Sequence, residues 1–142
     1  MPQAGNIISQ QNISVLSNGP DGANTLFITT GLMVCGLSQN NPTGSGNANS
    51  ETFSATLDQP LLTAAQFRRA IASASLASIN SSFPASASAS GSANSCATTS
   101  VEAHFDDESG RVQLLVDLQV GAAFGSVELF SIGFFVMTTA AV

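Results

Sequence analysis

A chain of 142 residues with 44% apolar side chains is long enough for one domain with a hydrophobic core. Charged residues make up only 8% of the chain, lysine is absent, and nine carboxylates leave a net charge of −6. Without a basic patch, neither nucleic acid nor an anionic membrane surface is an expected partner. Nine phenylalanines supply the burial that disordered Ser- and Asn-rich chains lack.

The N-terminal stretch MPQAGNIISQQ has neither a basic nor a long apolar segment, so no signal peptide is visible. The most apolar stretch, residues 129–142, is shorter than the roughly 20 residues that a membrane-spanning helix needs. We therefore expect no membrane span.

The first half of the chain reads as strands joined by turns. Residues 12–17 are β-prone, and the two turn dipeptides in SNGPDG at 17–22 predict a hairpin. Residues 25–37 are apolar at odd and even positions alike, and their two glycines favour a bulged strand over a helix. Residues 38–50 are predicted as a loop and residues 52–57 as a short strand.

Residues 63–79 carry the one helix that the sequence predicts. Thr63 and Gln66 have the spacing of a capping box, which satisfies two backbone N–H groups at a helix start. Four apolar side chains follow at the spacing of one helical face: Phe67, Ala70, Ile71 and Ala74.

The Ser- and Ala-rich segment at about 84–100 is predicted as a loop or linker. The alternative is flat β structure, whose small side chains would let it pack closely against another chain.

Three strands are predicted near the C-terminus, at residues 101–105, 111–120 and 126–139, and short turns join them into an antiparallel meander. The second alternates apolar and polar residues, which is typical of a strand with one buried face. The third is apolar on both faces. We expect one face to hold Phe130, Ile132, Phe134 and Val136, and the other to hold Val127, Leu129, Phe135 and Met137.

These patterns predict a mainly β fold: an antiparallel β-sandwich or jelly-roll-like domain with one short α-helix at about 63–79. Residues 1–142 are expected to form this single domain.

Cys35 and Cys96 match neither a metal-site nor a redox spacing. A disulfide between them would close a loop of about 60 residues and stabilise the fold by about 4 kcal/mol. The alternative is a free thiol at Cys35, which lies in an apolar run and would act there as a small hydrophobic side chain.

No motif indicates catalysis. His104 is the only histidine, and no G-x-S-x-G context accompanies it, so a hydrolase using His104 is a minor alternative and we expect no enzyme. Asp106, Asp107 and Glu108 are consecutive and lack the spaced ligands of a calcium loop. A solvated acidic turn is expected there, although Ca²⁺ held between subunits stays open. No metal or cofactor is predicted.

A strand that is apolar on both faces must be covered twice, and natural sheets protect exposed edges with charges, lysine above all. This chain has little charge on any predicted strand. We therefore expect its faces and edges to be covered by copies of the same chain. The alternative is a compact two-layer sandwich in which the helix at 63–74 and the strand at 25–37 cover the final strand within one chain. The predicted polar contact joins Arg68 and Arg69 to the acidic turn 106–108 of a neighbour. The predicted interface residues are Arg68, Arg69, Asp106, Asp107, Glu108, Phe130, Phe134, Phe135 and Met137.

The predicted function is that of a structural, self-assembling subunit, a virion or tail component or an extracellular fibre, whose partners are copies of itself and other structural proteins of the same assembly. The alternative is a non-enzymatic binding module, a small oligomer that recognises a protein or glycan through loops 38–50 and 84–100. Oligomerisation behaviour distinguishes them, because a module stays a fixed small oligomer whereas a subunit forms very large particles.

Overall fold

The computed structural model describes residues 2–19, 22–41, 47–82, 94–122 and 125–141, and these form eight strands without a helix. In chain order the strands are β1 (Gln3–Ala4), β2 (Asn6–Gly19), β3 (Gly22–Asn41), β4 (Asn47–Thr56), β5 (Phe67–Ser82), β6 (Asn94–Asp106), β7 (Arg111–Ala122) and β8 (Gly125–Ala141).

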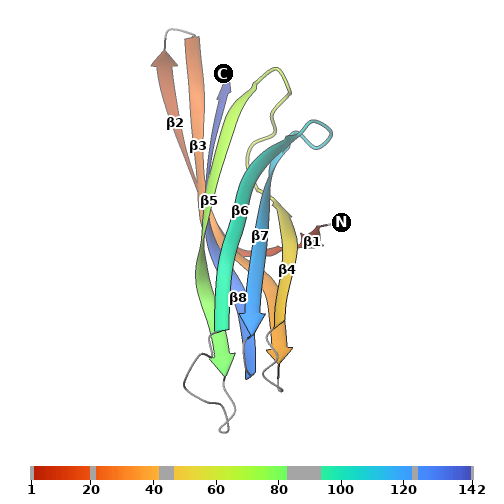
Figure 1. The fold of residues 1–142 in the computed structure, drawn as a ribbon. Coiled ribbons are helices and arrows are strands. Elements are labelled where there is room, and N and C mark those ends of the chain that lie inside the picture. The colour runs from red at the N-terminus through yellow and green to blue at the C-terminus, as the bar shows by residue number, and fades with distance from the viewer. Residues whose placement is uncertain (1, 20–21, 42–46, 83–93, 123–124, 142) are drawn as a thin grey trace.

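The strands form two four-stranded sheets that share one core (Figure 1). Sheet A has the order β1-β4-β7-β6, and sheet B has the order β2-β3-β8-β5. All pairs are antiparallel except the two-residue pairing of β1 with β4. The prediction of a mainly β fold is confirmed, and the two packed sheets fit the sandwich that the sequence indicates.

β7 is a central strand of sheet A, and its alternation is as predicted. Every second residue from Val112 to Ala122 is buried against sheet B, while the residues between them are at least partly exposed. A strand with this pattern can cover a core on one face and meet water on the other.

β8 is central in sheet B, but its two faces differ from the predicted ones because its alternation shifts near Phe130. Val127 and Leu129 are buried, and so are Ile132, Phe134 and Val136, although the two sets have opposite parity. The pairings on both sides of β8 are irregular at this level, between Val34 and Leu37 on β3 and between Leu76 and Ile79 on β5. Such a bulge turns the following side chains to the other face.

The predicted helix at 63–79 is wrong. The capping-box contacts do form, because the Thr63 N–H donates to Gln66 Oε1 at 2.9 Å and the Gln66 N–H donates to Thr63 Oγ1 at 3.3 Å. They close a single turn, after which the chain enters β5 and pairs with β8. Pairing with β8 completes the backbone hydrogen bonds of that buried strand, and this gain outweighs local helix propensity.

The predicted C-terminal meander is only half formed. β6 pairs with β7, but β7 does not pair with β8. Instead the chain changes sheets: β7 ends at Ala122 in sheet A, and β8 begins at Gly125 in sheet B, where it lies between β3 and β5. This crossing gives β8 a covered inner face, because β7 then packs across the core from it rather than beside it.

The edge strands β5 and β6 belong to different sheets and lie next to each other (Figure 1). The rings of Phe67 and Phe105 stack between them, with centroids 4.6 Å apart and planes 6° from parallel. This contact closes one side of the core. The opposite edge of sheet B is β2, and the hairpin of β2 and β3 extends past the sheet A strands (Figure 1).

Candidate functional site

The outer face of sheet B, which points away from the core, carries an apolar row across all four strands. Register places Ile13 of β2 beside Ile28 of β3, Ile28 beside Met137 of β8, and Met137 beside Ile71 of β5. Ile13 and Ile71 are 60% and 44% exposed. We call these four residues the apolar row. The outer face of a two-sheet domain is normally polar, so this row indicates an interaction surface.

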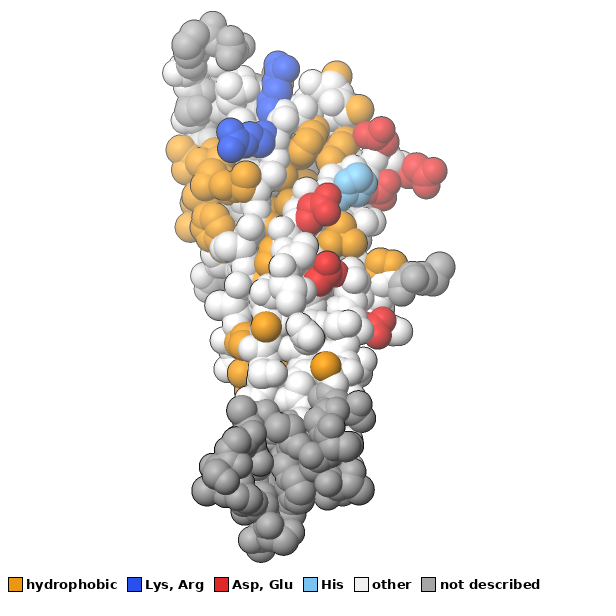
Figure 2. Space-filling view, in the orientation of Figure 1, with side chains coloured by type: hydrophobic (Ala, Val, Ile, Leu, Met, Phe, Trp, Pro, Cys, Tyr) orange, Lys and Arg blue, Asp and Glu red, His pale blue; other side chains and the backbone are white. Residues whose placement is uncertain are grey.

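Further apolar side chains extend this surface along the strands. Val15 lies one step from the row towards the hairpin tip, and Phe135 lies one step away in the other direction. Beyond the bulge, Phe130 is 45% exposed. Figure 2 shows apolar side chains gathered on this side of the molecule, with charged side chains on neighbouring parts of the surface.

The four aromatic and methionine residues predicted for the interface separate into two groups. Phe130, Phe135 and Met137 lie on the outer face of sheet B, whereas Phe134 is 4% exposed and belongs to the core. Phe134 is therefore not available to a partner. The sequence prediction missed Ile13, Ile28 and Ile71, because strand pairing alone brings them beside Met137.

The free edge of sheet B is β2, a strand of 14 residues without a charged side chain or a proline. Asp21 is the only charged residue among the first 50 of the chain. Within the described residues, β2 pairs with β3 on one side and with no strand on the other. Its exposed side chains include Ile8, Ile13 and Leu16. Natural edge strands of this length normally carry charges that block further pairing.

Arg68 and Arg69 are exposed and lie at the start of β5, where a register shift separates Phe67 from Arg69. Arg69 pairs with Thr139 and therefore lies on the outer face of sheet B, next to the apolar row. Among the described residues, the only ion pair joins Arg111 to Asp58 at 3.6 Å. The charges of Arg68 and Arg69 are thus available to a partner.

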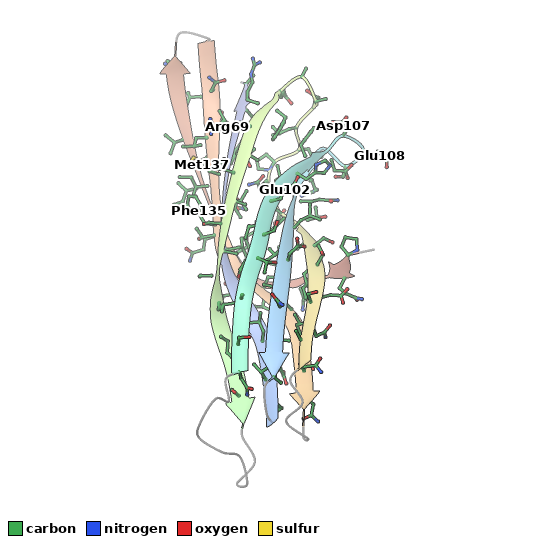
Figure 3. The ribbon with its side chains drawn as sticks, in the orientation of Figure 1. Arg69, Glu102, Asp107, Glu108, Phe135 and Met137 are labelled. Carbon is green, nitrogen blue, oxygen red and sulfur yellow. The ribbon has the colours of Figure 1, made fainter. Side chains whose placement is uncertain are left out.

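The acidic turn lies on the other side of the molecule. Asp106 belongs to its own turn: its carboxylate accepts the Glu108 N–H at 3.2 Å, and a hydrogen bond with the Ser109 side chain lowers the Asp106 pKa. Asp107 and Glu108 are exposed, as is Glu102 on the outer face of sheet A. Figure 3 shows Arg69, Phe135 and Met137 on one side and Glu102, Asp107 and Glu108 on the other. One chain cannot bring the two groups together, so their contact between neighbours stays a prediction.

Cys35 and Cys96 are both free thiols in the structure, so the predicted disulfide alternative is not formed. Cys35 is 2% exposed and lies in the core, and this burial raises its pKa to about 12. Burial also raises the pKa of Cys96. Neither thiol is therefore prone to act as a nucleophile at neutral pH.

His104 is exposed on sheet A, where it pairs in register with Gln113. The described residues contain no group of three or more His, Cys, Asp or Glu side chains that could hold a metal ion. They also contain no helix that is long and apolar enough to cross a membrane.

Both predicted recognition loops are partly strand. Residues 38–41 belong to β3 and residues 47–50 to β4, while residues 94–100 belong to β6. The remainder of both segments lies outside the described residues. The loop prediction is wrong for the strand portions because their backbone groups pair with β7 and β8. At residues 94–100 the alternative prediction of β structure is the one that the structure has.

No protein-family model, curated protein or solved structure shows significant similarity to this chain. We therefore infer its function from its own surfaces.

Proposed function

We propose that this protein is a structural subunit that assembles with copies of itself, as in a virion or tail component or an extracellular fibre. The observation that carries the proposal is the free edge of β2. This strand has 14 residues and no charged side chain, and on the side away from β3 it pairs with no strand among the described residues. A strand of this kind is a template for pairing with another chain.

A second copy of the chain is the partner that this edge favours. Two β2 strands can pair antiparallel, because neither carries a charge that would be placed against its own copy. The main-chain bonds supply affinity without a specific partner sequence. The net charge of −6 opposes association at long range, but none of the described carboxylates lies on β2. The virion or extracellular setting rests on composition and stays a prediction.

The test is light scattering across a dilution series, together with negative-stain electron microscopy. We expect the wild-type chain to form particles much larger than a monomer. The variant Ile8→Lys/Ser14→Lys places two cations on the exposed β2 edge and should reduce the mean mass at least tenfold, since edge lysines block pairing. The control is Leu61→Lys, a position that is 64% exposed and outside every strand, which should assemble like the wild type.

A monodisperse wild-type monomer at every concentration would overturn the proposal. Circular dichroism of each variant confirms that the fold is intact.

A further inference from the structure

Edge pairing through β2 cannot build a large assembly alone. An antiparallel contact between two β2 strands uses the same surface on both copies, so it closes after two chains. The other edge of sheet B is β5, and this strand lies against β6 of sheet A. An assembly of self-associating subunits therefore needs a second contact surface.

We propose that the outer face of sheet B is this second surface and that it packs against the same face of another copy, related by a twofold axis. This inference rests on the proposed self-assembly and names the contact that would extend it. With two different twofold contacts, each copy joins two others, and the assembly grows as an open chain when the two axes do not intersect.

The charges on this face favour a second copy in the opposite orientation. Arg69 pairs in register with Thr139 near one end of β8, whereas Glu128 lies near the other end and pairs with Ser38 and Asn80. Ser38 and Asn80 are exposed, as is Glu128, so Glu128 points outward like Arg69. At about 3.3 Å per residue, the two charges are roughly 35 Å apart on one face.

A twofold axis midway between them brings Arg69 of each copy to Glu128 of the other. Both ends of the contact then hold opposite charges, which a partner with a different charge pattern would not match.

The apolar side chains between these charges fit the same arrangement. The axis passes close to Gly133, which lies between Glu128 and Thr139 on β8. Met137 of one copy then lies over Phe130 of the other, and the apolar rows lie on either side of the axis. Both Ile71 and Phe130 are more than 40% exposed in the single chain and would be covered by this contact. Burial of apolar area supplies its main driving force.

The arrangement differs from the alternative contact between Arg69 and the acidic turn of a neighbour. That contact joins the outer face of sheet B to the opposite side of the next copy (Figure 3). In that contact Glu128 would have no charged partner. The apolar row would be covered by the outer face of sheet A, which is largely polar and includes Gln113, Asp117 and His104.

Charge reversal distinguishes the two contacts by sedimentation velocity. In the Ile8→Lys/Ser14→Lys background, edge pairing is blocked and we expect a dimer held by the faces. Adding Ile71→Lys should convert this dimer to monomer, whereas adding Leu61→Lys should leave it intact. Adding Arg69→Glu should weaken the dimer at least tenfold, and adding Glu128→Arg to that chain should restore it, because both reversed pairs then match.

Two results would contradict the proposed twofold contact. If Asp107→Arg/Glu108→Arg restores the Arg69→Glu chain and Glu128→Arg does not, the proposed twofold contact is wrong. A dimer that Ile71→Lys leaves unchanged also overturns it. In both cases large wild-type particles would still support self-assembly, whereas a wild-type monomer would remove self-assembly itself.

Discussion

Phe67 and Phe105 stack with ring centroids 4.6 Å apart and join the edge strands of two different sheets. Neither ring is fully buried, yet both pack against the core cluster. The pair covers the side of the core where β5 and β6 meet. It also fixes the start of β5, because Phe67 follows the turn that begins at Thr63.

Replacing Phe67 with Ala should lower the free energy of unfolding by about 2–3 kcal/mol, because the substitution removes the stacked ring and opens the core. Urea denaturation measures this loss. The control Leu61→Ala should change stability by no more than about 0.5 kcal/mol, since Leu61 is 64% exposed. All variants are compared at one protein concentration, because self-association raises apparent stability. Equal losses at the two positions would contradict the role of the stack.

A second contact links sheet B to the segment after β4. Gln59 is 6% exposed, and its Nε2 donates a hydrogen bond of 2.7 Å to Oγ1 of Thr29, which is fully buried. Gln59→Leu should cost about 1–3 kcal/mol in unfolding free energy, because it leaves the Thr29 hydroxyl without this partner. The double variant Gln59→Leu/Thr29→Val should recover part of that loss. Thermal denaturation of both single variants and the double variant gives the coupling energy between Gln59 and Thr29. If the two single losses of stability simply add, the predicted interaction between these side chains is excluded.

Two glycines of β3, Gly31 and Gly36, allow a substitution at a crowded position to be compared with the same substitution at an open one. A Cβ at Gly31 would come within 2.8 Å of Phe134 Cζ and even closer to the Ser9 carbonyl oxygen, whereas one at Gly36 would meet nothing within 4 Å. Gly31→Ala should therefore destabilise the fold by at least about 2 kcal/mol, because backbone must move. Gly36→Ala should be close to neutral. Denaturant midpoints compare them, and a neutral Gly31→Ala would mean that β2 and β3 do not approach as the structure shows.

Alkaline pH should destabilise the protein through Cys35. Burial raises its folded-state pKa from 9.0 to about 12, so the folded thiol stays protonated while the unfolded one ionises. The unfolded state then binds fewer protons, and the unfolding free energy falls as the pH rises from about 9 to about 12. No Lys or Tyr side chain titrates in this range, because the sequence contains neither.

Unfolding free energies at several pH values between 8 and 12 measure this effect. Cys35→Ala should show a shallower decline, with the remainder due to Cys96, whose pKa is also raised. If the unfolding free energy of Cys35→Ala falls with pH as steeply as that of the wild type, Cys35 is not the cause of the alkaline destabilisation.

Local sequence was sufficient to predict a strand or turn where its conformation depends mainly on residues next to it in the chain. The alternation of β7 and the hairpin between β2 and β3 could be predicted, because a period of two and a turn sequence are local signals. The same reasoning failed for residues 67–82. There the Ala and Ser alternation from Ala70 to Leu76 was a strand signal, but the helical spacing of Phe67, Ala70, Ile71 and Ala74 fitted the same residues.

Composition and local pattern indicate a β-rich chain whose low charge leaves its strand edges unprotected. Which strands are neighbours could be learned only from the folded structure. In that structure β8 lies between β3 and β5, and β5 is a strand where a helix was predicted. The buried face of β8 also changes parity near Phe130. These outcomes depend on backbone pairing between distant segments, whose energy no local pattern contains. The same pairing assembled the apolar row and placed Arg69 and Glu128 on one face.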